Sequence, residues 1–214
     1  MIGLLFPSLD TYTPLVPLLQ LASPLFINVI HTSFRQPSSA PSANFIVVGS
    51  LKLSSGGNIH RISRVISHSN YNGLLIKNDV AVLELENELE FSEFIQPIEL
   101  ERQLIGEVDC VVSGWGRLCV WGSLPDKLQF IPLKTISLEA CQARWSASQV
   151  LEDEICTLTV RGEGVCNGDS GGPLVANGKQ IGIVSWGNPC ANGRPDVYAR
   201  VSSYVGWIEN AIRS

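Results

Sequence analysis

The sequence predicts an all-β fold that closes with one amphipathic helix, and three observations support this prediction. Short runs of β-branched or alternating apolar residues recur from residue 45 to residue 201, separated by turns rich in Gly, Asn and Pro. The last segment repeats apolar residues at helical spacing, namely Val201, Val205, Ile208 and Ile212. Of the 214 residues, 45% are hydrophobic and 16% are charged, which excludes intrinsic disorder. Many short strands with tight turns are typical of an antiparallel sandwich or barrel.

The first 44 residues differ from the rest of the chain. They hold six of the twelve prolines, and the stretch 36–44 is typical of a loop or linker. Residues 1–34 are apolar but contain no Lys or Arg, so they make a poor signal peptide. Prolines at four positions in this stretch would break a spanning helix, so we expect no membrane anchor. We therefore expect an atypical N-terminal segment over 1–44.

From residue 45 onward, the sequence predicts strands in close succession. In chain order they are expected at 45–48, 62–66, 80–85, 111–112, 128–133, 173–175, 181–186 and 197–201. The turns Ser54-Ser-Gly-Gly57 and Asn70-Tyr-Asn-Gly73 separate the first three strands. The helix follows, with Ser202 or Ser203 as its expected N-cap.

Charge and cysteine content exclude several classes of partner. The net charge of −5 argues against a nucleic-acid partner, because phosphate binding needs an excess of Lys and Arg. No Asp or Glu occurs between Asp10 and Asp79, so this stretch offers no carboxylate-built Ca²⁺ loop. The six cysteines contain no C-x-x-C pair, so we expect no metal site, and nothing in the sequence suggests a cofactor. Disulfides, and hence an oxidising extracellular compartment, are the expected use of these cysteines.

The segment that most clearly carries chemistry is Cys166-Asn-Gly-Asp-Ser-Gly-Gly-Pro-Leu174. Ser170 stands among glycines, which let the backbone approach a substrate closely and direct adjacent N–H groups at one point. A bare Ser-Gly-Gly is more often a plain turn. The Gly-Asp before Ser170 and the Pro-Leu after Gly172 favour the functional interpretation.

This segment resembles the active-site serine motif of the chymotrypsin/trypsin family of serine peptidases, and the resemblance runs from about residue 45 to residue 214. Four further segments carry it: Asn78-Asp-Val-Ala-Val-Leu-Glu-Leu85, Ser113-Gly-Trp-Gly116, Ser185-Trp-Gly187 and Pro195-Asp-Val-Tyr198. The resemblance implies a trypsin-like double β-barrel with a C-terminal helix. The second barrel is expected to be complete and the first truncated, with 45–214 as the peptidase domain.

The resemblance also assigns roles to residues. Ser170 matches the nucleophile, and the N–H groups of Gly168 and Ser170 match the oxyanion hole. Asp79 matches the aspartate of the triad, and it precedes Ser170 by 91 residues, against about 93 in the chymotrypsin order. Asp169 matches the acid that pairs with a new N-terminal amine after zymogen cleavage.

Substrate-binding positions follow in the same way. Ser185, Trp186 and Gly187 resemble the strand that pairs with the substrate backbone. Gly164 takes the floor of the P1 pocket, where trypsin-like members carry Asp, and this favours a hydrophobic P1 residue. Asp196 takes a wall position where the family often has Gly. Its carboxylate either narrows the pocket, offers a displaced partner for a basic P1 residue, or turns aside onto backbone amides.

The resemblance further implies two disulfides, Cys141–Cys156 and Cys166–Cys190. The family partner of Cys110 falls near Ala176, so Cys110 and Cys119 are expected to be free thiols.

The general base is the missing part of the pattern. The family's Ala-Ala-His-Cys segment is absent, and Ile46-Val-Val-Gly49 lies too close to Asp79 to be the mature terminus. His60 and His68 also lie too close to Asp79, and we expect both to be ordinary exposed histidines. His31 is the one candidate, 48 residues before Asp79 against about 45 in the chymotrypsin order.

Three functional interpretations follow. In the first, the chain is a secreted, monomeric serine endopeptidase that forms an acyl-enzyme on Ser170, acts on polypeptides and meets protein protease inhibitors. In the second, it is a catalytically inactive homologue that binds or regulates partners through the same cleft. In the third, residues 1–44 differ from those of the true product, which is an active protease.

Overall fold

The structure is a computed structural model that describes residues 26–28, 45–158, 160–188 and 190–213. Its elements are β1 (Phe26–Asn28), β2 (Phe45–Val48), β3 (Asn58–Ser67), β4 (Ala81–Leu85), β5 (Glu99–Leu100), β6 (Asp109–Gly114), β7 (Gln129–Ile136), α1 (Leu138–Gln142), β8 (Glu154–Thr157), β9 (Pro173–Ala176), β10 (Lys179–Trp186), β11 (Asp196–Arg200) and α2 (Val201–Arg213). The chain is mostly β, with one long helix at its end, as the sequence predicts.

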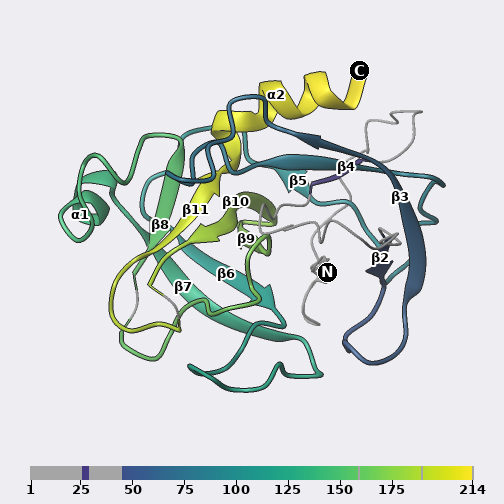
Figure 1. The fold of residues 1–214 in the computed structure, drawn as a ribbon, viewed down its shortest axis with the longest axis horizontal. Coiled ribbons are helices and arrows are strands. Elements are labelled where there is room, and N and C mark those ends of the chain that lie inside the picture. Colours follow the sequence, from purple (N-terminus) through teal and green to yellow (C-terminus); the bar gives the residue numbers. More distant parts are fainter. Residues whose placement is uncertain (1–25, 29–44, 159, 189, 214) are drawn as a thin grey trace.

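The first half of the chain forms a four-stranded antiparallel sheet in the order β1-β4-β3-β2. Figure 1 shows its strands β2, β3 and β4 on the right of the molecule. Alternation along β2 places Ile46 and Val48 inside, where they pack with Leu83, Leu85 and other apolar side chains. This sheet is the part of the predicted first barrel that the structure describes.

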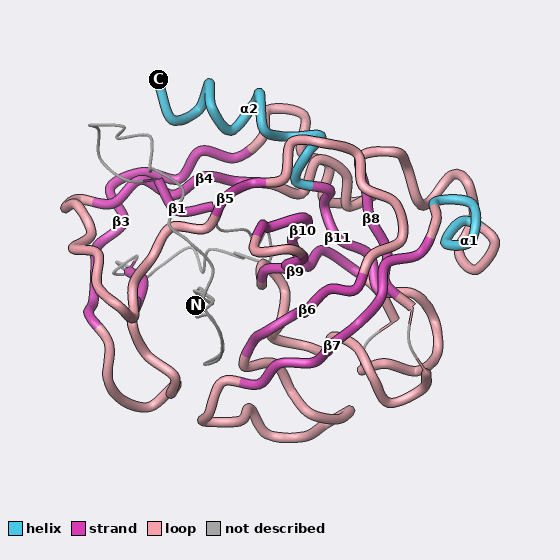
Figure 2. The backbone as a smooth tube through the Cα atoms, turned by 180° about the vertical axis from the view of Figure 1, so that it is seen from behind, coloured by secondary structure: helices cyan, strands magenta, loops and turns pink. Residues whose placement is uncertain are grey.

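The second half forms a closed barrel. Strands β11, β8, β7, β6, β9 and β10 are hydrogen-bonded in that order, and β10 pairs with β11 to close the ring. The short β5 adds to β10 as a parallel edge. Figure 2 shows these strands from behind, with β6 and β7 crossing the lower part of the barrel. The barrel interior is apolar, and its fully buried members include Leu174, Ile181 and Tyr198.

Helix α2 joins the two halves. Its buried face, formed by Val201, Tyr204, Val205, Ile208 and Ala211, packs in one cluster with β4 of the first sheet and with β10 and β11 of the barrel. Figure 1 shows the helix lying across one end of the strands. Burial of a shared apolar cluster thereby fixes β4, and the segment before it, against the barrel.

The structure also corrects several sequence-based expectations. No strand is predicted before residue 45, but β1 pairs with β4. Elements β5, α1 and β8 are not predicted either. The helix begins at Val201, so Ser202 and Ser203 lie inside it and neither is its N-cap. No helix among the described residues is long and apolar enough to cross a bilayer.

Two disulfides join the pairs that the resemblance implies, Cys141 with Cys156 and Cys166 with Cys190. Cys110 and Cys119 are free thiols, as expected. Cys110 is buried, and desolvation raises the pKa of its thiol to about 11, so this thiol is unreactive at neutral pH. Cys119 is exposed.

Candidate functional site

Asp79 is buried at the entrance to β4, and Ser185 reaches it from the barrel. The Ser185 hydroxyl donates a hydrogen bond of 2.7 Å to Asp79 Oδ2, although 106 residues separate the two. Only 4% of Asp79 is exposed, so water contributes little to its solvation. Asn78, directly before it, has a left-handed backbone with φ of 51°. That turn lets the chain reverse just before Asp79 enters β4.

Ser170 lies in the turn that leads into β9. The turn is closed by a bond from Asp169 N–H to the carbonyl of Cys166 (3.1 Å) and by one from Gly172 N–H to the carbonyl of Asp169 (2.8 Å). Gly171 N–H then donates to Val184 O at 2.8 Å, which fixes the turn onto β10. Because Val184 precedes Ser185 on that strand, the structure brings Ser170 and Asp79 to the same region.

The N–H groups of Gly168 and Ser170 form no hydrogen bond with another described residue. Gly168 has φ of 103°, which a residue with a side chain rarely adopts, so this position needs glycine. A small cavity of about 90 Å³ adjoins these two residues, with Leu53 and Leu124 in its wall. Free N–H groups beside a cavity are the donors that an anionic oxygen would use.

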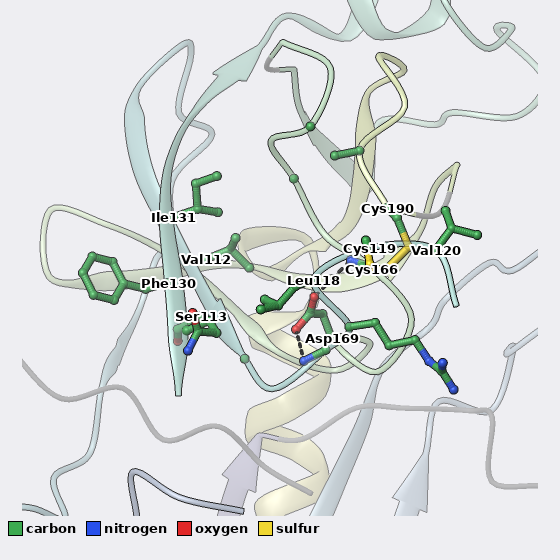
Figure 3. Close-up of a pocket in the computed structure, with 17 residues that line it drawn as sticks. Val112, Ser113, Leu118, Cys119, Val120, Phe130, Ile131, Cys166, Asp169 and Cys190 are labelled. Atoms are coloured by element: carbon green, nitrogen blue, oxygen red, sulfur yellow. Dashed lines mark hydrogen bonds between the residues drawn. A yellow bond between two sulfur atoms is a disulfide. The ribbon is translucent and has the colours of Figure 1, made fainter. Parts of the chain in front are cut away.

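Asp169, in the same turn, lines this small cavity and also a larger one of about 540 Å³. Its Oδ1 accepts the Gly116 N–H at 2.8 Å, and its Oδ2 accepts the Cys166 N–H at 3.0 Å. Figure 3 shows both bonds, with Leu118 and the Cys166–Cys190 disulfide close by. Burial raises the pKa of Asp169, and the two N–H donors partly oppose this shift. No ion pair to Asp169 occurs within the described part of the chain.

Asp196, at the start of β11, is a second buried carboxyl group. Its Oδ2 accepts the Val165 N–H at 2.9 Å, whereas its Oδ1 is buried without a partner among the described residues. A Cβ atom on Gly164 would lie 2.3 Å from Oδ2, so the Asp196 side chain occupies the space above Gly164. Desolvation raises the Asp196 pKa to about 6. One Asp196 oxygen thus turns onto a backbone amide while the side chain also narrows the space above Gly164, so two of the three alternatives describe its geometry.

Comparison with known proteins identifies the family. A family model described as Trypsin matches residues 37–208. The chain belongs to the trypsin family of serine proteases.

Three insect relatives support this membership. The chain is 38% identical to Chymotrypsin-2 of Vespa crabro over 164 residues, which cover 75% of this chain and 74% of that protein. It is 31% identical to Trypsin of Phaedon cochleariae over 188 residues, 85% of this chain and 72% of the relative. It is 34% identical to Serine protease SP24D of Anopheles gambiae over 191 residues, 87% of this chain and 68% of the relative.

The histidines differ from expectation. His60 and His68 are half-buried rather than exposed. The His68 ring packs against Tyr204 at 5.8 Å and Trp207 at 5.0 Å between ring centroids, and its Nδ1 accepts the Asn70 N–H. This places His68 between the first sheet and α2, in a packing role. His31 lies outside the described residues.

Two charged residues beside this site, Glu154 and Lys77, were not predicted from the sequence. Glu154, on β8, accepts a hydrogen bond of 2.9 Å from the Trp186 indole N–H. It also forms an ion pair with Lys77 at 2.9 Å. Glu154 begins a short, buried strand, and no local pattern in the sequence shows that its carboxylate pairs with distant residues. The described residues contain no group of three or more His, Cys, Asp or Glu side chains that could hold a metal ion.

Proposed function

We propose that the chain is a serine endopeptidase in which Ser170 attacks the scissile carbonyl and carries the acyl group. The observation that supports this most directly is the partly buried hydrogen bond from Ser185 to Asp79, because Ser185 lies on β10, the strand to which the Ser170 turn is bonded. In this proposal Asp79 orients a histidine that takes the Ser170 proton and returns it to the leaving amine. The N–H groups of Gly168 and Ser170 stabilise the oxyanion.

His31 is the proposed general base. A serine without a base stays protonated and is a weak nucleophile. The alternative is an inactive homologue that binds partners through the same cleft, and the absence of the family's Ala-Ala-His-Cys segment favours it.

Labelling with a fluorophosphonate probe separates the two. We expect stoichiometric labelling of the parent chain, none in Ser170→Ala, and at least a hundredfold slower labelling in His31→Ala. Asp79→Asn should slow labelling, whereas an exposed matched variant, Asp126→Asn, should not. If the parent is labelled no faster than Ser170→Ala, the proposal that this chain is an active endopeptidase fails. That result agrees with the inactive homologue and equally with a product whose residues 1–44 differ.

We further propose that Asp169 is the acid that receives a new N-terminal amine. Its carboxylate lines the cavity of about 540 Å³ and forms no ion pair with a described side chain. An ammonium group that enters the cavity would therefore pair with this carboxylate. Such a partner would lower the pKa that burial raises.

The proposed substrates are polypeptides with Phe, Tyr or Leu at P1. Gly164 leaves the pocket floor uncharged, and the Asp196 side chain narrows the space above it. The free Asp196 Oδ1 is the one feature that favours a basic residue. The test is kcat/KM on matched Phe, Leu, Arg and Lys peptides. A tenfold preference for Arg or Lys that disappears in Asp196→Gly would contradict the hydrophobic assignment.

The remaining elements of the proposal follow from composition and bonding. Two disulfides are typical of an oxidising compartment, so we propose a secreted protein, monomeric and open to protein inhibitors. Residues 45–214 are proposed as the peptidase domain, close to the matched range 37–208.

A further inference from the structure

A buried ion pair lies beside the candidate site. Lys77 Nζ is 2.9 Å from Glu154 Oε2, and the two side chains are only 12% and 6% exposed. Lys77 precedes Asp79 by two residues, whereas Glu154 begins β8 of the barrel. The pair therefore connects the segment that carries Asp79 to the C-terminal barrel.

Every charged atom of this pair has further partners. Glu154 Oε2 also accepts the Leu151 N–H at 2.8 Å, and Oε1 accepts the Trp186 indole N–H at 2.9 Å. Lys77 Nζ also donates to the carbonyl of Gln149. Buried charges are tolerated when they are paired and hydrogen-bonded in this way. The geometry of the pair is consequently well defined.

Together with the site, the pair closes a ring of contacts. Lys77 is joined to Asp79 through the backbone, and Asp79 accepts the hydrogen bond of Ser185. Ser185 is bonded to Trp186, whose indole donates to Glu154, and Glu154 returns to Lys77. Three non-covalent contacts and two short pieces of chain thus form one closed circuit. Displacement of Glu154 must affect both Asp79 and Trp186.

The backbone around Lys77 is strained. Ile76 and Asn78, its two neighbours, have φ of 50° and 51°. The left-handed region is unfavourable for a β-branched residue such as Ile76. Conformations of this kind persist where the surroundings over-determine them. The Lys77 side chain, held by Glu154, is the anchor directly after the strained Ile76, and Asn78 on its other side is a residue type that tolerates the left-handed conformation.

The circuit extends to the Asp196 side of the site through aromatic packing. The Trp186 ring meets the Trp145 ring at 5.1 Å in an edge-to-face arrangement. Trp145 in turn donates its indole N–H to the carbonyl of Pro195, directly before Asp196. Fixing Trp186 therefore fixes one wall of the region that Asp196 borders.

We propose that Lys77 and Glu154 are positioning residues for the proteolysis proposed above, on which this inference rests. Their ion pair holds the Asp79 carboxylate against Ser185 and holds the Trp186 indole on the strand that pairs with substrate. A buried ion pair adds little stability over an apolar pair of similar volume. Its effect is therefore expected in catalytic geometry more than in folding.

The kinetic test compares Glu154→Gln, Lys77→Met and the double variant, using the full chain. Both single variants should lower kcat about tenfold on an ester that ends at P1, because Asp79 loses its orientation. On a peptide extended by three residues before P1, KM should also rise severalfold, because Trp186 moves. The double variant should be no worse than the poorer single variant, and Lys77→Arg should keep most of the activity.

Matched controls are Glu152→Gln, an exposed carboxylate two residues before Glu154, and Lys127→Met, an exposed lysine. Neither should change kcat or KM beyond twofold. The double variant leaves no unpaired buried charge, so it folds even if a single variant does not. Kinetics within twofold of the parent in folded variants, or losses that multiply in the double variant, would overturn the proposal.

Amide hydrogen exchange tests the same proposal without catalysis. In a Ser170→Ala background, Glu154→Gln should speed exchange at least tenfold in residues 77–82 and 183–187, and Glu152→Gln should not. If the parent chain is not labelled by fluorophosphonate, the proteolysis proposal fails, yet exchange still reports on the ion pair. Unchanged exchange in both segments would refute the positioning role.

Discussion

Folding buries the Asp196 carboxyl group and changes the pH at which it loses its proton. Desolvation raises its pKa from 3.8 to about 6, the charge of Asp169 adds to this shift, and the Val165 N–H opposes it. In the unfolded chain the pKa returns to its ordinary value. Between pH 4 and pH 6 the folded protein therefore holds a proton that the unfolded chain has released. This linkage lowers stability as the pH rises through that window.

Removing the charge at Asp196 should reverse this loss. We expect Asp196→Asn to be more stable than the parent at pH 7, by up to about 3 kcal/mol, and nearly equal to it at pH 4. Urea unfolding of both proteins between pH 4 and pH 8 measures the difference. Asp126→Asn serves as a control of opposite sign. The exposed Asp126 carboxylate accepts the Ser54 N–H and its pKa is lowered, so removing its charge should not raise stability at pH 7. A difference that does not change with pH would contradict the argument.

The Ser185 hydroxyl supplies a donor to a buried carboxylate. Ser185→Ala leaves Asp79 Oδ2 without this 2.7 Å bond, in a place where only 4% of Asp79 is exposed. We expect the free energy of unfolding at pH 7 to fall by about 1.5–3 kcal/mol. Chemical denaturation measures the loss, and Ser123→Ala in an exposed loop is the control. An unchanged unfolding free energy would mean that water or another group replaces the hydroxyl.

At the residue scale, the sequence proposed candidate residues but not their contacts. Motif and spacing singled out Ser170 and Asp79 as candidates, because a Gly-rich turn around a serine leaves a local signature. The partner of Asp79 lies 106 residues away, and Lys77 lies 77 residues from Glu154. No periodicity spans such separations, so both contacts needed the three-dimensional structure.

Among the elements, strands made of apolar or β-branched runs were predictable, and very short or polar ones were not. The predicted range 45–48 coincides with β2, which has one buried face, and 181–186 lies within the largely buried β10. By contrast, β8 has the sequence Glu-Ile-Cys-Thr, so neither an apolar run nor an alternation marks it. The polar residues at its two ends have partners far away in the sequence. Glu154 pairs with Lys77, and the Thr157 hydroxyl is hydrogen-bonded to the Tyr198 hydroxyl at 3.0 Å. Helix α1 has five residues and a Ser137 cap, too few for a helical period.

Substitutions on the buried and the exposed face of α2 are expected to change the free energy of unfolding in opposite directions. Ile208 is 1% exposed and packs in the cluster that contains Val80 and Ile183. Ile208→Ala should lower the free energy of unfolding by about 2–5 kcal/mol, through lost burial and a residual cavity. Gly206 is exposed, and a Cβ added there would meet open space. Gly206→Ala should therefore raise the free energy of unfolding by about 0.5–1 kcal/mol. Thermal and urea unfolding of both variants provide the measurement. Equal losses in both would show that α2 does not join the two halves as described.

For the molecule as a whole, the candidate site lies where the first sheet meets the barrel. Asp79 and Lys77 come from the side of the first sheet, whereas Ser170, Ser185 and Glu154 come from the barrel. The barrel closes on itself through β10 and β11. The first sheet does not, because within the described residues β2 pairs only with β3 and β1 only with β4. Among the described strands, β1 and β2 are therefore the edges of the sheet on the side that delivers Asp79.

Open strand edges bearing apolar side chains favour association between copies. On the edge pair β2 and β3, the exposed apolar residues are Phe45 at 51%, Ile59 at 69% and Val65 at 51%. Ile59 lies opposite Val47 of the edge strand. We therefore expect the isolated chain to be monomeric when dilute and to associate non-specifically as its concentration rises, at a rate set by this surface.

A charge placed there should suppress that association without unfolding the protein. Ile59→Lys should lower the light-scattering increase on concentration at least severalfold, because lysine on an exposed edge opposes strand-to-strand pairing. Its free energy of unfolding should stay within about 0.5 kcal/mol of the parent, since the Ile59 side chain is mostly in solvent. Leu104→Lys is the control, because Leu104 is 79% exposed in a loop away from the strands. Equal suppression by both variants would point to net charge as the cause, and a parent that stays monomeric at all concentrations would rule out the edge as an association site.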